Sequence, residues 1–235
     1  MATERRKKRQ SGQEIVEFAV LAFLFVGLFM GWFVTGMSLI RSLQANQVCA
    51  NLSNMYIHGA DFSTYGMQQL AQRIAGGLKL EIGSSFTGSQ TANTDNTGNV
   101  LVTVTQIMWV GATTAPNCVA AGGASKCTNH DSFVFTQRIQ FGNGAVATAH
   151  PSTLGDPTTT AISSSGYIQD PVTDSGAALP AAAQSSMQSL WQVTGGGRTP
   201  LVDGQVCYVV ELYAQSPDLS LGSYQSAGVY GRYFF

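Results

Sequence analysis

The hydrophobic positions of this chain change their period along its length, from an unbroken apolar run to a helical stripe and then to strand-like alternation. Residues 18–40 contain no charged side chain over 23 positions. At a rise of 1.5 Å per residue, such a helix is about 35 Å long, enough to cross a hydrocarbon core of about 30 Å. The pattern therefore predicts a transmembrane helix over residues 18–40.

The same helix is predicted to continue beyond the membrane with one apolar face. Apolar residues recur there at spacings of three and four: Ala45, Val48, Cys49, Leu52, Met55 and Tyr56. We expect this face to pack against a folded domain and Gly59 to end the helix. A second helix is predicted between a Ser63 cap and Gly76-Gly77, with an apolar face of Met67, Leu70, Ala71 and Ile74.

Alternation with a period of two then predicts β-strands. The alternating runs lie at 78–82, 100–105, 133–141 and 206–212, and residues 228–235 are a further candidate strand. Helices first and strands afterwards favour an α+β fold, in which an antiparallel sheet covers the amphipathic part of a long N-terminal transmembrane helix.

Residues 142–203 are rich in Ser, Thr, Gly and Ala and hold few large apolar residues. We expect a long surface insertion between two strands, with a short helix around Leu190 and Trp191. Long insertions are often functional, so this one is a candidate partner surface. A tolerated solvated insertion explains the composition as well.

Charge is distributed unevenly, although the net charge is only -1. Five of the twelve basic residues lie at positions 5–9, and the chain after Ile40 carries a net charge of -3. A basic tip can bind nucleic acid, but the adjoining apolar run favours a topology signal instead. By the positive-inside rule, the N-terminus is cytoplasmic and residues after Ile40 are extracytoplasmic.

Other kinds of membrane signal compete with this interpretation. A cleaved secretory signal has an apolar region of about 7–15 residues that ends at small residues. Here the run is longer, and Met30, Trp32 and Phe33 fill its later half. A plain, uncleaved signal anchor remains an open alternative.

Glu17 lies at the edge of the apolar run, where a carboxylate is costly and favours a charged partner. A cut after Gly12 would create a new α-amino group on Gln13, and Glu17 would become the fifth residue. In a bundle of parallel, axially offset helices, this amine of one subunit can meet Glu17 of the next. Such a pair would set the register of assembly.

Gly27 and Gly31 form a GxxxG motif within the run, and Thr35 continues the stripe of small residues. Such stripes allow two helices to approach closely in lipid. Glycine is also common in membrane helices of every kind, so self-packing and ordinary composition both explain the motif.

These N-terminal features together resemble a type IV prepilin. The string RRKKR…SG/QEIVEFAVLAF has the basic leader, the glycine before the cut, the glutamate at the fifth mature position and the apolar helix. GQEIVEFAVLAFLF is most similar to TadE-like proteins, the minor pseudopilins of tight-adherence (Tad) pili. The resemblance covers about the first 60 residues, with a weaker likeness at VCYVVELYAQSP.

The resemblance implies a pilin-like fold, other pilin subunits as partners, and a membrane-embedded aspartyl prepilin peptidase that cuts between Gly12 and Gln13. It also implies frequent methylation of the new amine. On this basis residues 1–12 are a leader peptide, 13–60 the transmembrane and amphipathic helix, and 61–235 an extracytoplasmic α+β domain.

The four cysteines all lie after the membrane run, in a compartment where disulfides persist. Four cysteines allow three pairings. Cys118 and Cys127 share one short loop and are the first expected pair, which leaves Cys49 and Cys207 to join the long helix to a late strand. A zinc site is the rival, but CxxC spacing and a histidine in register are both missing.

Sequence motifs for catalysis are also missing. The three histidines are scattered, and there is no GxSxG, HExxH or P-loop. The sequence thus predicts no enzyme, cofactor or nucleic-acid partner. It predicts a minor pilin subunit, single-pass in the inner membrane and incorporated in a Tad-type pilus. The alternatives are an unprocessed signal-anchored envelope binding protein and a membrane-tethered enzyme.

Overall fold

The computed structural model describes residues 2–82, 97–159, 161–191, 201–216 and 228–235, with only the backbone described for residues 2–13 and for Trp191. The chain divides into two compact units, Met1–Arg41 and Ser42–Phe235. Helix α1 (Ala2–Ile57) contributes to both units. Each unit is described separately below.

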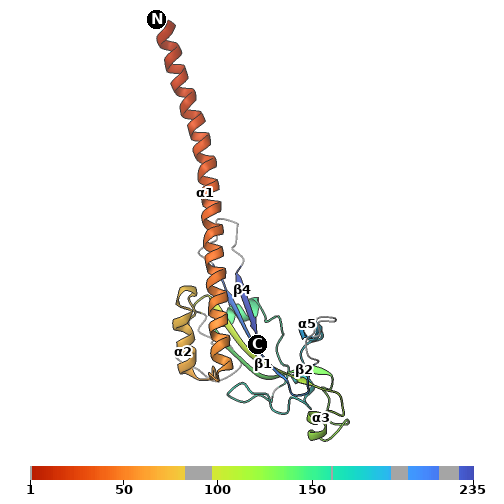
Figure 1. Cartoon of the computed structure of the whole chain (residues 1–235). Helices are drawn as coiled ribbons and strands as arrows, with labels where there is room; N and C mark the ends of the chain where they lie inside the picture. The colour runs from red at the N-terminus through yellow and green to blue at the C-terminus, as the bar shows by residue number, and fades with distance from the viewer. Residues whose placement is uncertain (1, 83–96, 160, 192–200, 217–227) are drawn as a thin grey trace. The chain divides into compact units, whose positions relative to one another are not determined.

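The first unit consists of the N-terminal part of α1 (Figure 1). From Glu14 to Ile57, α1 is long and apolar enough to span a membrane by length and composition. Most large apolar side chains between Ile15 and Leu39 are exposed. This is the pattern expected for a helix whose surroundings are lipid or other apolar helices.

The second unit contains a four-stranded antiparallel sheet with the strand order β2-β1-β3-β4. The strands are β1 (Val100–Val110), β2 (Ser132–Gly142), β3 (Val206–Ala214) and β4 (Val229–Phe234). β1, β2 and β3 match alternating runs of the sequence, and β4 matches the further candidate strand at 228–235. The prediction of an α+β fold with an antiparallel sheet is therefore confirmed.

One face of the sheet packs on the amphipathic part of α1 and on α2 (Tyr65–Ile74). Every apolar residue predicted for this face of α1 is buried or partly buried there. Tyr56 also forms a polar contact between α1 and β2, because its hydroxyl donates a hydrogen bond to Oε1 of Gln137 at 2.6 Å. Gly59, with φ of 87°, follows the end of α1 as expected.

The second face of the sheet is covered by residues of the segment between β2 and β3. This segment contains α4 (Gly144–Ala149), the 3-10 helix η2 (Ser175–Ala177) and α5 (Ala181–Trp191), the short helix expected near Leu190. A second core forms here. The segment contributes Leu154, Ile168, Ala177, Leu179, Ala183 and Met187, and the sheet contributes Ile107, Trp109, Phe133, Phe135, Cys207 and Val209. The segment is thus a layer of the fold as well as a surface insertion.

Two local expectations are wrong. Residues 78–82 form no strand: Leu78 ends the 3-10 helix η1 (Gly76–Leu78), and Lys79 then adopts φ of 59°. Left-handed backbone interrupts the extended conformation that a strand needs, although Leu80 is still buried. Thr64, not Ser63, precedes α2, and the amide of Ser63 instead donates to Oδ1 of Asp61.

The apolar face predicted for α2 is also partly wrong. Gln68 is fully buried and its side-chain amide donates to the Phe62 carbonyl at 2.8 Å, whereas Leu70 is 40% exposed. This hydrogen bond offsets part of the free-energy cost of burying the amide, while Oε1 of Gln68 has no hydrogen-bond partner among the described residues.

Cys118 and Cys127 form a disulfide with a Cα–Cα distance of 5.0 Å, as predicted. It joins the short helix α3 (Pro116–Ala120) to the loop that leads to β2. Asp203 anchors the same region, because its carboxylate accepts hydrogen bonds from the amides of Gly111 and Asn117, each at 2.8 Å.

The predicted bridge between Cys49 and Cys207 is wrong, and both thiols are free and buried. Cys49 faces the first core, where its Sγ donates to the Val210 carbonyl at 3.0 Å. Cys207 belongs to the second core on the opposite face of the sheet. The sheet therefore separates the two sulfur atoms.

Candidate functional site

The exposed apolar helix is the first candidate site. Glu17 lies on its exposed surface, one residue before the uncharged run. Phe23 and Trp32 are 84% and 85% exposed, so the helix presents large side chains to its surroundings. This surface can serve as a membrane anchor, and it can pack against apolar helices of other chains.

The GxxxG motif forms a groove on this helix. An open depression lies over Gly27, Gly31 and Thr35, with Leu28, Trp32 and Leu39 beside it. A Cβ atom added to Gly27 or Gly31 would meet nothing within 4 Å. The Thr35 hydroxyl donates to the Gly31 carbonyl at 2.8 Å, so it needs no water in an apolar setting.

The proposed processing residues fall in the segment of α1 whose side chains are not described. Gly12 and Gln13 belong to the backbone of α1. The cut between them, and the meeting of the new amine with Glu17, therefore stay predictions.

A second candidate site is a buried polar cluster on the face of the sheet that carries the second core. Arg138 on β2 is 1% exposed. Its guanidinium donates to Thr105 Oγ1 at 2.7 Å and to Asp156 Oδ1 at 2.5 Å. Its Nη1 also lies 3.9 Å from Oε2 of Glu211 on β3. Opposite charges on β2 and β3, the two strands that flank β1, thus offset one another away from water.

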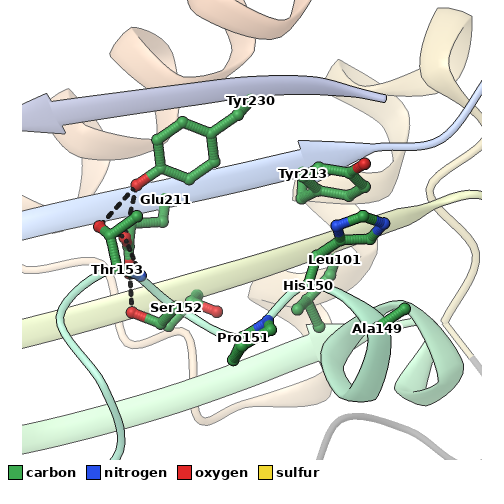
Figure 2. Close-up of a pocket in the computed structure, with 10 residues that line it drawn as sticks. Leu101, Ala149, His150, Pro151, Ser152, Thr153, Glu211, Tyr213 and Tyr230 are labelled. Carbon is green, nitrogen blue, oxygen red and sulfur yellow. Dashed lines mark hydrogen bonds between the residues drawn. The ribbon is translucent and has the colours of Figure 1, made fainter. Parts of the chain in front are cut away.

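Glu211 is 3% exposed and is held by donors from two segments. Its carboxylate accepts hydrogen bonds from the hydroxyls of Ser152 and Thr153, the amide of Thr153, and the hydroxyl of Tyr230 on β4. Figure 2 shows these side chains converging on Glu211. Because of these bonds, the carboxylate has a fixed orientation and the hydroxyl groups have fixed donor directions.

The surface above this cluster is hollowed into a pocket of about 270 Å³. Figure 2 shows the polar groups at one side and the rings of His150 and Tyr213 at the other. These two rings are stacked, with centroids 3.8 Å apart and an angle of 19° between their planes. We call this cavity the His150 pocket. Its lining residues are Leu101, Thr103, Ala149, His150, Pro151, Ser152, Thr153, Glu211, Tyr213 and Tyr230.

The phenol of Tyr230 is kept protonated by its surroundings. Burial raises its pKa, and the negative charge of Glu211 and the hydrogen bond to that carboxylate raise it further. Tyr230 therefore acts as a neutral donor to Glu211 near neutral pH.

The described residues offer little support for catalysis or metal binding. Among them, no group of three or more His, Cys, Asp and Glu side chains could hold a metal ion. His130 lies beside Asp131, with 3.2 Å between Nδ1 and Oδ2, but both side chains are exposed at the surface. Its position suggests an ordinary surface contact.

Sequence reasoning identified Glu17, Gly27 and Gly31 but not the His150 pocket. The sequence contains a signal for Glu211, because it is a charged residue between Val210 and Leu212 in an otherwise apolar strand. Its hydrogen-bond partners Ser152, Thr153 and Tyr230 are distant in sequence, and no sequence pattern links them to Glu211.

Comparison with known proteins yields no match to a family model, a curated protein or a solved structure.

Proposed function

We propose that the chain is a TadE-like minor pilin subunit, made as a prepilin and held in the inner membrane by residues 18–40. It is trimmed after Gly12 and used to build or tip a Tad-type pilus, with the second unit outside the membrane. One observation carries the proposal. An exposed apolar helix has Glu17 at its edge, shortly after Gly12 and a basic cluster.

The exposure of the helix supports a role in packing. Burying one large apolar side chain is worth about 1.5–3 kcal/mol relative to water, so the exposed side chains need lipid or other helices. The glycine groove supports the second option, since it lets a neighbouring backbone approach. In this proposal, lipid surrounds the helix before assembly, and the helices of other subunits surround it after incorporation into the pilus.

The second unit supports an extracytoplasmic location. Its Cys118–Cys127 disulfide fits an oxidising compartment, and the positive-inside rule directs it there. Assembly through the helix would leave this unit on the surface of the pilus or at its tip.

Glu17→Ala tests the assembly role. The carboxylate of Glu17 is proposed to pair with the α-amino group of Gln13 in a neighbouring subunit. Removing one partner of a buried ion pair costs about 3–5 kcal/mol. Since each 1.4 kcal/mol is a tenfold change, incorporation into pili should fall by about 100-fold or more.

The measurement compares the amount of variant protein in membranes with that in sheared pili. Glu14→Ala is the matched control, because Glu14 is an exposed carboxylate on the same helix that has no role in the pairing. Both variants should reach normal levels in the membrane. Normal incorporation of Glu17→Ala, or an equal defect in Glu14→Ala, would argue against the pairing.

A further inference from the structure

We propose that the His150 pocket binds a neutral polyhydroxy ligand, such as one sugar ring of a glycan. This binding function belongs to the second unit and is separate from assembly through the helix. It rests on the shape of the pocket, on the local charge, and on the hydrogen-bonding groups that remain available.

The size of the pocket limits the ligand. Sites for drug-sized molecules usually measure about 300–1,000 Å³, and this pocket measures about 270 Å³. A single small ring therefore fits better than a long chain. The stacked rings of His150 and Tyr213 line one side of the pocket, and they offer apolar contact area for the C–H groups of a pyranose ring.

The local charges favour a neutral ligand. Glu211 is negative, but the guanidinium of Arg138 lies 3.9 Å from its carboxylate. Arg232 adds a second positive charge, because its Nη1 donates to the Thr153 hydroxyl at 2.7 Å. Asp156 offsets the charge of Arg138 in turn. A cation or an anion would gain little in a setting whose charges already cancel.

The free hydrogen-bonding capacity at the polar side of the pocket consists mainly of acceptors. The hydroxyls of Ser152 and Tyr230 each donate to Glu211, and each oxygen keeps a lone pair for a further donor. A carboxylate has about four lone-pair sites, and within the described part of the chain Oε2 of Glu211 accepts a hydrogen bond from Ser152 alone. The ligand should therefore bring several donors, as the hydroxyl groups of a sugar do.

The test is ligand-observed saturation-transfer NMR on the full chain, held in a detergent without sugar headgroups. The probes are D-galactose, D-mannose and N-acetyl-D-glucosamine, with choline and acetate as a cation and an anion for comparison. At least one sugar should bind saturably, with Kd near about 1 mM. Choline and acetate should give no saturable signal.

His150→Ala removes one ring of the wall and should weaken sugar binding by about tenfold or more. His130→Ala is the control, because His130 is an exposed histidine that does not line the pocket. If His150→Ala does not fold, the near-isosteric Thr103→Val, which removes a lining hydroxyl, takes its place. The proposal is overturned if no sugar in the panel binds, if a pocket variant binds as well as the wild type, or if only choline or acetate binds.

Discussion

Met187 on α5 gives the sharpest test of the second core. Its side chain is fully buried against the face of the sheet that lies opposite α1. Truncation of a buried methionine to alanine costs about 2–5 kcal/mol, since apolar contacts are lost and a cavity remains. We take about 3 kcal/mol for Met187→Ala, because the site lies among bulky sheet residues that cannot collapse onto the gap.

This loss can be read as a change in the unfolding temperature. For a domain of 150–250 residues, each kcal/mol shifts Tm by about 2–4 °C, so Met187→Ala should lower Tm by about 6–12 °C. Near-UV circular dichroism of the full chain in detergent reports the tertiary packing of the second unit. Far-UV signals are less suitable because the long α1 dominates them.

Leu190→Ala is the matched control on the same helix. Its side chain is 39% exposed, so its truncation should cost about 1 kcal/mol or less. If Met187→Ala lowers Tm no more than Leu190→Ala does, then α5 is not packed on the sheet. The account of residues 142–203 as a structural layer would then fail.

Two further predictions concern the cysteines. Replacing Cys118 and Cys127 together by alanine should lower the free energy of unfolding by about 2.5 kcal/mol, from the loop entropy of a bridge between residues 9 positions apart, and an unchanged Tm would contradict this. Iodoacetamide should label neither Cys49 nor Cys207 in the folded protein and should label both in denaturant, as read by intact mass. Both thiols are buried, and burial raises the pKa of Cys207 to about 12, so little reactive thiolate is present near neutral pH. Fast labelling of either thiol in the folded protein would contradict their buried positions.

The main elements could be predicted because their patterns are long and regular. The apolar run predicted α1, and the stripe from Ala45 to Tyr56 predicted which face of α1 is buried. The strands β1, β2 and β3 each have nine or more residues, which is enough for alternation to be distinctive. The run at 78–82 has only five positions, and local backbone geometry at Lys79 overrode it.

The second layer was harder to predict because its core residues are sparse. Leu154, Ile168, Leu179 and Met187 are spread over a segment rich in small and polar residues. Apart from the short helix expected around Leu190 and Trp191, the segment gave no prediction of a regular element, so composition suggested a solvated insertion. Its contacts with the sheet depend on tertiary packing, which local pattern does not encode.

The error about Cys207 has a different origin. The alternation in 206–212 already placed Cys207 on the face opposite to Val210 and Leu212, and those two residues pack toward α1. The predicted Cys49–Cys207 bridge, which was chosen because these two cysteines were left over, ignored the alternation of side chains between the two faces of the strand. The His150 pocket, by contrast, assembles residues from β1, β3, β4, the end of α4 and the segment after it, and sequence spacing alone could not bring these together.

The central claim is that the chain is a processed subunit that assembles through α1. Its most direct test is the intact mass of the protein extracted from membranes of a host that has the prepilin peptidase. The account predicts a chain that begins at Gln13, with or without one added methyl group, and a full-length chain for Gly12→Leu. Wild-type protein from the same host that still begins at Met1 or Ala2 would contradict the account.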